Sequence, residues 1–349
     1  MAAYTTIDDP ELFYQTELFT GNASTGHAQT LDGSEDMQPD MVWFKNRDST
    51  DVPSIYDAVR GATKRLVVTS TAVESDQVNG LQSFNSDGFT VGGNAECNET
   101  GEKIVAWCWK AGTTSGLSGG SITPDAYSFN TTSGFSIVKF EGNGTVGATV
   151  AHGLGAVPKA IIIKGTDLYA NNWQVYHVKA GNLGNLVLNN DDAFADDDSR
   201  WNDTTPTSTV WTMGSGATVN YNGRTFVAYV WADVQGFSKC GSYEGNANTD
   251  GTFIYTGFRP AFVMVKRSNS TGSWGMRDNK REAYNNGQDF LLADTTNADQ
   301  TSATIDFLSN GFKLRHNGSE ENTSGSTMIY MAFAEAPFVN SSGVPCNAR

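Results

Sequence analysis

The sequence has no run of 18 apolar residues, the minimum for a membrane-spanning helix, and no basic, then apolar segment at its N-terminus that could act as a secretory signal. It also lacks a basic cluster. Its 23 lysines and arginines stand against 38 aspartates and glutamates, which gives a formal net charge of −15. An acidic chain repels nucleic-acid backbones. We therefore expect a protein made in the cytoplasm, without membrane insertion and without a nucleic-acid partner.

Cysteine is scarce, and catalytic fingerprints are missing. The four cysteines, at positions 97, 108, 240 and 346, form no CxxC or CxxH pair, so we expect buried free thiols. No HExxH, GxSxG, Walker or dinucleotide-binding pattern occurs. The four histidines occupy unrelated positions: His27, His152, His177 and His316. These absences predict a protein that is not an enzyme and that needs neither a cofactor nor a metal.

One loop keeps a metal alternative open. Five aspartates crowd residues 191–198, and hard carboxylate oxygens at short spacing can hold Ca²⁺. The order of these residues is not that of an EF-hand. A solvated acidic loop and a calcium site are therefore both retained, and we assign no metal ligand.

Charged residues make up only 17% of the chain and hydrophobic residues 38%, whereas glycine, asparagine, threonine and serine are abundant. This composition favours many turns and short strands. No window shows a sustained helical period, and the nearest helical candidate, residues 72–80, is short and polar.

Three blocks recur in the same order along the chain. The first is an aromatic-x-Gly-Asn turn, which begins at Phe19, Phe140 and Tyr243. The second runs without gaps from a proline to a lysine. Its three copies are Pro39 to Lys45, Pro158 to Lys164 and Pro260 to Lys266. The third ends each unit on a large aromatic residue, at Trp109, Trp231 and Phe333.

The second and third blocks read as strands. Each run after a proline is short and apolar, and a proline at a strand's first residue removes only an initial donor. The closing blocks are apolar on both faces, which predicts central strands of a covered sheet, with the three closing aromatics buried at equivalent positions. We therefore predict an all-β chain of three tandem homologous repeats, each a small antiparallel β-sandwich, with bounds 1–112, 113–236 and 237–349. The pattern leaves open whether the sandwiches are separate or share sheets.

Two sets of repeat residues have alternative interpretations. Lys45, Lys164 and Lys266 end an apolar strand, where lysine usually extends its ammonium group to solvent. Trp173 and Trp274 hold equivalent positions, where core packing and stacking on a sugar are both open. Trp201 lies outside the shared blocks beside the acidic loop, so we expect it to be exposed. These three tryptophans are the candidate contacts with a glycan or receptor.

Six segments together carry a resemblance: MVWFKNR (41–47), YDAVRG (56–61), GFTVG (88–92), VAWCWKAG (105–112), TGFRP (256–260) and AEAPFVN (334–340). With them the chain resembles uncharacterised virion structural and tail-fibre-like proteins of tailed bacteriophages, marine ones especially. The second repeat departs most from the pattern, because it has the acidic loop and lacks the Gly-Phe pair of positions 88–89 and 311–312.

The resemblance implies a virion protein exposed on the particle, as a tail fibre or receptor-binding component. A capsid-decorating or head-fibre protein is the alternative, and a carbohydrate-binding or glycan-cleaving module is a further one. The partners expected are other virion proteins and a host-cell glycan or receptor. We also expect a homo-oligomer, with a trimer favoured because fibres and decorations occupy symmetric positions. The N-terminal segment 1–18 is the candidate attachment arm.

Overall fold

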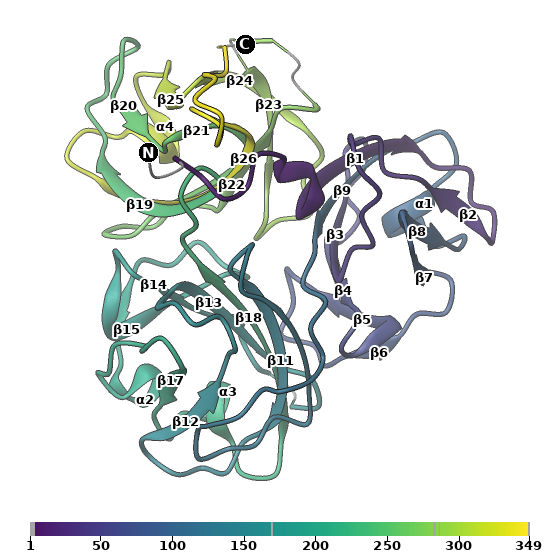
Figure 1. Cartoon of the computed structure of the whole chain (residues 1–349), viewed down its shortest axis with the longest axis vertical. Coiled ribbons are helices and arrows are strands. Elements are labelled where there is room, and N and C mark those ends of the chain that lie inside the picture. Colours follow the sequence, from purple (N-terminus) through teal and green to yellow (C-terminus); the bar gives the residue numbers. More distant parts are fainter. Residues whose placement is uncertain (1–3, 169, 282–283, 286, 348–349) are drawn as a thin grey trace.

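The computed structural model describes residues 4–168, 170–281, 284–285 and 287–347. Strands dominate it and gather in three lobes around a common centre (Figure 1). We name these the first lobe (strands β1–β9), the second lobe (β10–β18) and the third lobe (β19–β26). The expected all-β class is confirmed, with several antiparallel sheets.

The first lobe contains two sheets. Its main sheet has six strands in the order β1 (Tyr14–Thr20), β9 (Lys103–Trp109), β3 (Met41–Asn46), β4 (Ser54–Asp57), β5 (Gly61–Val67) and β6 (Ser75–Asp76). The smaller sheet has the order β2 (His27–Gln29), β8 (Gly88–Val91) and β7 (Leu81–Asn85). A buried cluster that includes Phe44 and Phe89 fills the space between the two sheets, so the lobe resembles a β-sandwich.

The second lobe repeats this arrangement with one additional edge strand. Its main sheet has the order β10 (Ala126–Asn130), β11 (Phe135–Glu141), β18 (Thr225–Ala232), β13 (Pro158–Gly165), β14 (Gln174–His177), β15 (Gly181–Val187) and β16 (Ala195–Asp196). The smaller sheet pairs β12 (Ala148–Ala151) with β17 (Val210–Met213). Trp211 of β17 packs edge-on against Phe140, as Phe89 packs against Phe19 in the first lobe. A tryptophan therefore fills the place of the missing Gly-Phe pair.

The third lobe has a single sheet that curls over its own core. The strand order is β19 (Ser238–Glu244), β26 (Thr327–Pro337), β21 (Phe258–Arg267), β22 (Gly275–Asp278), β23 (Gly287–Leu292), β24 (Gln300–Leu308), β25 (Gly311–Leu314) and β20 (Phe253–Tyr255). Strands β19 and β20 are thus the two edges of this sheet.

When the edge strand β10 is left out, five strands have the same order in each main sheet and pair in matching register. They are β1, β9, β3, β4 and β5 in the first lobe, β11, β18, β13, β14 and β15 in the second, and β19, β26, β21, β22 and β23 in the third. The closing strands β9, β18 and β26 lie between two neighbours and are almost entirely buried, so the prediction of central strands is confirmed. The closing aromatics have matching partners on both sides: Trp109 pairs with Tyr14 and Met41, Trp231 with Phe135 and Ala160, and Phe333 with Ser238 and Phe262.

Helices are limited to single turns. They are η1 (Pro10–Leu12), α1 (Ala95–Asn98), α2 (Asp198–Trp201), α3 (Ala217–Asn220) and α4 (Ser319–Asn322). A helix of three or four residues is too short to leave a periodic pattern, so hydrophobic periodicity does not predict these helices. Residues 72–80, the nearest helical candidate in the sequence, form no helix; this segment is mostly loop and contributes strand β6. Within the described residues, no helix is long and apolar enough to cross a membrane.

Helices α1, α3 and α4 each end on an asparagine that holds the aromatic-x-Gly-Asn turn. Asn220 Oδ1 accepts the backbone N–H of Asn143 at 2.9 Å, and its Nδ2 donates to two carbonyls. Asn98 and Asn322 do the same for the other two turns. The glycine of the turn is required sterically, since a Cβ on Gly142 would lie 2.6 Å from the backbone oxygen of Tyr221.

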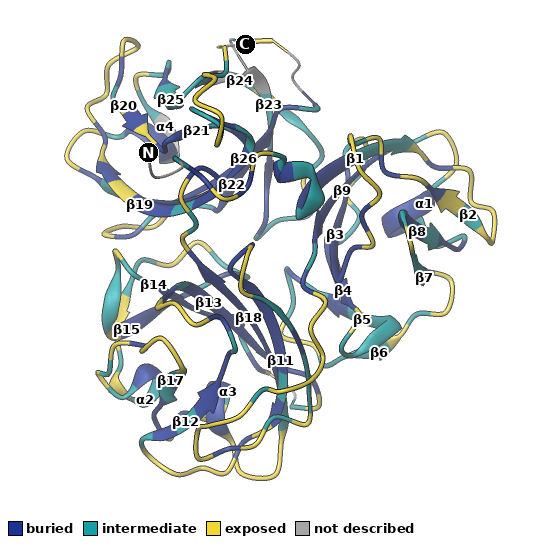
Figure 2. Ribbon diagram, in the orientation of Figure 1, coloured by how far each residue is buried: buried dark blue, intermediate teal, exposed yellow. Residues whose placement is uncertain are grey.

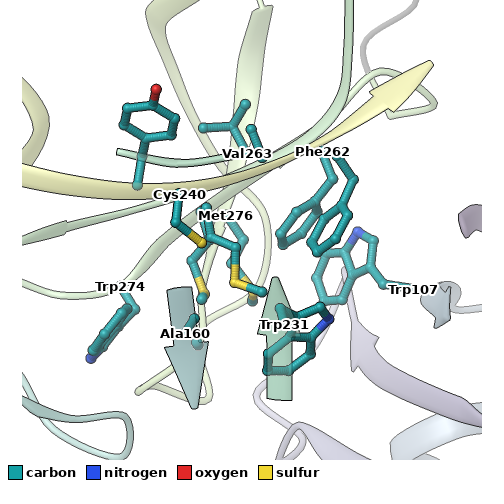
Figure 3. Packing of buried hydrophobic residues seen from close by; sticks show 14 of the residues in the cluster. Trp107, Ala160, Trp231, Cys240, Phe262, Val263, Trp274 and Met276 are labelled. Carbon is teal, nitrogen blue, oxygen red and sulfur yellow. The ribbon is translucent and has the colours of Figure 1, made fainter. Parts of the chain in front are cut away.

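The three main sheets share one core. Their inner faces form a single buried cluster, which appears as dark blue ribbon facing the centre in Figure 2. Trp109 lies 6.3 Å from Trp231 and 5.6 Å from Phe333, measured between ring centroids. Figure 3 shows Trp107, Trp231 and Phe262, one from each lobe, converging there. The question left open by the sequence is therefore answered: each lobe keeps its own sheets, and the lobes share a core.

The N-terminal segment is part of this body. Ile7 is 2% exposed and belongs to the shared core, and Thr5 Oγ1 donates to the carbonyl of Gln235 at 2.9 Å. Asp8 accepts hydrogen bonds from Ser341, which joins the two ends of the chain. Residues 4–18 are thus packed against the protein, and residues 1–3 of the expected attachment arm lie outside the described residues.

Candidate functional site

The three tryptophans expected to contact a glycan are buried. Trp173, Trp201 and Trp274 are 0%, 1% and 3% exposed, so none has a ring face open for stacking on a sugar. The expectation that Trp201 is exposed is wrong, because α2 places its indole in the second lobe's outer core against Tyr176, 5.8 Å away. For Trp173 and Trp274, core packing is the correct alternative.

The repeat lysines are also buried, and the expectation that they extend to solvent is wrong. Lys45, Lys164 and Lys266 are 0%, 0% and 1% exposed. Each ammonium group donates to a backbone carbonyl of a neighbouring lobe: Lys45 to Thr295 at 2.7 Å, Lys164 to Ser70 at 3.4 Å and Lys266 to Asp191 at 3.0 Å. Burial lowers the pKa of Lys45 to about 8 and that of Lys164 to about 7.

These contacts follow one direction around the molecule. The loop after β5 of the first lobe accepts the hydrogen bond of Lys164 in the second lobe. In the same way, the loop after β15 of the second lobe binds Lys266 in the third, and the loop after β23 of the third lobe binds Lys45 in the first. Backbone hydrogen bonds repeat the cycle, from Glu74 N–H to Thr166, from Phe194 N–H to Ser268 and from Asp299 N–H to Arg47. The lobes therefore form a closed ring.

A second set of contacts closes the same ring deeper inside. The hydroxyl of Tyr229 donates to Asp57 at 2.7 Å, and the indole N–H of Trp107 donates to Asp278 at 3.0 Å. At the remaining junction, His177 takes the place of the aspartate, and its Nε2–H donates to the carbonyl of Tyr330 at 3.1 Å. Each contact joins the end of a fourth strand to the central strand of the next lobe.

Both aspartates are held by a buried arginine three residues later. Asp57 pairs with Arg60 and Asp278 with Arg281, and all four side chains are at most 1% exposed. Burial alone would lower the pKa of each arginine, but the neighbouring carboxylates raise it above its ordinary value. Each of these two Asp-x-x-Arg pairs begins at the end of the fourth strand of its lobe and works as a structural clamp between lobes.

The three junctions differ in what covers them at the surface. Between the first and second lobes, strand β10 leaves a smaller cavity of about 350 Å³, which is lined by Asp40 of the first lobe and by Asp125, the residue before β10. Between the third and first lobes, Lys280 forms an ion pair with Asp32 at 2.7 Å. Between the second and third lobes there is an open cleft of about 490 Å³. We refer to this cleft, between β19 and β20, as the lysine cleft.

Three lysines line the lysine cleft: Lys159 and Lys179 from the second lobe and Lys239 from the third. The only carboxylate in its lining is that of Asp233, which accepts the N–H of Cys240 at 2.7 Å. Two of the exposed aromatic side chains of the chain, Phe253 at 43% and Tyr255 at 47%, belong to the same cleft. On a protein with a net charge of −15, this is a basic and partly aromatic surface.

The acidic loop has structural roles. The carbonyl of Asp191 binds Lys266, and the Asp197 side chain caps helix α2 by accepting the N–H of Ser199. Within the described residues, no three histidine, cysteine or carboxylate side chains converge as a metal site requires. The four cysteines are free thiols; Cys97, Cys108 and Cys240 are buried, as expected, and Cys346 is partly exposed.

Two features were not predicted from the sequence: the lysine cleft and the three asparagines that hold the aromatic-x-Gly-Asn turns, which we call the asparagine pivots. The pivots left a signal, because Asn98, Asn220 and Asn322 each follow the asparagine of the corresponding turn by 76 or 77 residues. The cleft left none, because its lysines come from three unrelated positions of two lobes.

Comparison with curated proteins gave no match, and comparison with solved structures gave none either. A family model does match, over residues 9–337. This range spans all three lobes and the contacts that close the ring. The chain therefore belongs to the family described as the domain of unknown function DUF7483.

Proposed function

We propose that the protein is a structural component of a bacteriophage particle, exposed on its surface as a tail fibre or receptor-binding component. A capsid-decorating or head-fibre protein is the alternative within the same class. The resemblance of six sequence segments to virion proteins supports this proposal. Two of these segments, 41–47 and 105–112, form most of the paired central strands β3 and β9.

The observation that carries the proposal is the closed ring. The cycles of lysine, backbone and aspartate or histidine contacts join the lobes around a shared core. Such a body is stiff, because no lobe can move without breaking contacts to both neighbours. Stiffness and many polar surface loops suit a component that is exposed on a particle and carries no catalytic task.

We also propose the finer description of the fold, in which the lobes are homologous repeats with bounds 1–112, 113–236 and 237–349. Common strand order, matching register and the repeated asparagine pivots support it. The repeats would have arisen from one unit that closes its core only as a ring of three.

Mass spectrometry of purified particles tests the virion role. We expect the protein at a fixed stoichiometry relative to the major capsid protein, and its absence from washed particles would contradict both assignments. Electron microscopy with a labelled antibody then separates tail from head.

For the assembly we propose a homotrimer. Light scattering of the purified protein should give three times the chain mass of 37.5 kDa. A monodisperse monomer at micromolar concentration would contradict a trimer that forms away from the particle.

A further inference from the structure

The lysine cleft is an open seam in the third lobe's sheet. Strands β19 and β20 are the two edges of that sheet, and two hydrogen bonds bridge the seam, one near each end. At one end Thr252 Oγ1 donates to the carbonyl of Glu244 at 3.2 Å, and at the other Lys239 Nζ donates to the carbonyl of Tyr255 at 2.8 Å. Between these contacts lies the cleft of about 490 Å³.

Backbone groups of β19 face into this seam. The N–H of Cys240 points away from β26, since it donates to Asp233. In an antiparallel strand the direction of the backbone groups alternates. The N–H and C=O of Ser242 therefore also point away from β26, toward the seam, and Ser242 lines the cleft.

The second lobe shows what fits such a seam. There the corresponding edges are β11 and β12, and the chain's own residues 120–130 lie between them. Ser121 and Ile122 donate their N–H groups to Thr149 of β12, and β10 pairs with β11 over five residues. Ile137 of β11 corresponds to Cys240 of β19, because each pairs with the same position of the closing strand. An extended polypeptide segment is thus the natural occupant.

The third lobe cannot supply this segment itself. In the second lobe it comes from the linker between β9 and β11, residues 110–134. The linker between β18 and β19 spans only residues 233–237, which is just long enough to connect the two strands. The linker that precedes the third lobe therefore cannot fill the third seam as the linker before the second lobe fills its own.

Charge indicates the chemistry of the occupant. In the second lobe, Ser128 of the filling segment donates its hydroxyl proton to Asp40 of the neighbouring lobe at 3.2 Å. Lys159 holds the position of Asp40 in the next lobe, since each precedes the residue that pairs with the closing aromatic. An acidic side chain at the Ser128 position would therefore meet Lys159. Lys179 and Lys239 add to the positive charge of the cleft.

We propose that the seam between β19 and β20 binds an extended acidic segment of a neighbouring polypeptide, which adds to the edge of β19 as a strand. On entry, the ammonium group of Lys239 leaves the carbonyl of Tyr255 and turns to a carboxylate of the incoming segment. Strand addition of this kind gains affinity from main-chain hydrogen bonds and selectivity from side-chain pockets. The proposal rests on the strand order and not on the virion role.

The test uses the full chain and a fluorescent peptide with the sequence of residues 118–130 and the change Ser128→Asp. We expect saturable binding by fluorescence polarisation, weakened by salt. The unsubstituted peptide should bind about two- to fivefold more weakly, as for a partly exposed ion pair. Lys159→Asp should reverse this preference, whereas Lys103→Asp, at an exposed lysine on the first lobe, should leave it unchanged.

The strand geometry has its own variants. Ser242→Pro removes the N–H that faces the seam and should weaken peptide binding about fivefold or more, the effect of one hydrogen bond. Ser242→Thr keeps the N–H and should bind as the unchanged chain does. Hydrogen exchange gives a measurement that needs no variant, because bound peptide should protect the amide of Ser242, which faces the seam.

Three results would overturn the proposal: no saturable binding of either peptide, binding without protection of β19, or binding that Ser242→Pro leaves unchanged while its melting temperature is intact. An acidic oligosaccharide made of uronic acid units is the competing ligand. If it bound through the same lysines without protecting the β19 amides and the peptide did not bind, the cleft would be a glycan site.

Discussion

Acid should weaken the protein at the junction between the second and third lobes, through His177. The imidazole is 4% exposed, its Nε2–H donates to the carbonyl of Tyr330, and its Nδ1 accepts the N–H of Lys179 at 3.2 Å. Both ring nitrogens are therefore used by the neutral form. Burial, together with the smaller effect of the charge of Lys179, lowers the pKa of His177 from 6.5 to about 4, although the hydrogen bond to the Tyr330 carbonyl raises it.

The sign of the effect follows from proton binding. Below about pH 6.5 the unfolded chain protonates this histidine, whereas the folded chain keeps it neutral until about pH 4. Stability contributed by the neutral imidazole is therefore complete above pH 6.5 and is lost as the pH falls toward 4. At about 1.4 kcal/mol per pH unit, the loss is about 2 kcal/mol at pH 5.

The variant His177→Gln isolates this contribution. A glutamine amide can donate to the Tyr330 carbonyl as Nε2 does, and it does not titrate. Urea denaturation at about pH 7.5 and about pH 5, followed by tryptophan fluorescence, should show a smaller loss of stability for the variant, by about 2 kcal/mol. His27→Gln, in the outer layer of the first lobe, is the matched control. Equal pH dependence in the unchanged chain and His177→Gln would refute the reasoning.

Three further predictions concern stability and are measured by urea denaturation at neutral pH. Trp231→Ala, in the shared core, should lower the free energy of unfolding by about 3–5 kcal/mol and should weaken all three lobes together. The exposed Tyr221 is the control and should tolerate alanine. Unfolding in separate steps would contradict a common core. Asn220→Ala removes the hydrogen bonds of this side chain to Asn143 and Thr145 of the turn and to the carbonyl of Gly214, and should cost about 2–4 kcal/mol; no change would mean that this asparagine is dispensable. Ile7→Ala should cost about 2 kcal/mol or more because this side chain belongs to the core; an unaltered midpoint would show that the N-terminal segment is a detachable arm.

The candidate site could be foreseen only in part, and the errors have one physical cause. The blocks that end in Lys45, Lys164 and Lys266 predict strands, and β3, β13 and β21 lie there. A lysine at the end of a strand is solvated in an isolated sandwich. Here the preceding lobe of the ring covers that end and offers a carbonyl at 2.7–3.4 Å, so the charge is buried. The same closure buries Trp173 and Trp274, whose indole N–H groups donate to carbonyls of the preceding lobe.

By itself, the sequence determined the local structure. β-branched and aromatic runs specify strands, glycine specifies the turns at Gly21, Gly142 and Gly245, and apolar residues on both faces specify central strands, because each depends on neighbouring residues or on the period of one strand. Only the tertiary structure decided that the inner faces meet in one core, that the lobes close into a ring, and that one seam stays open. The ring depends on contacts between residues 75 to 250 positions apart in the chain. The open seam depends on a linker of five residues where the preceding lobe has twenty-five.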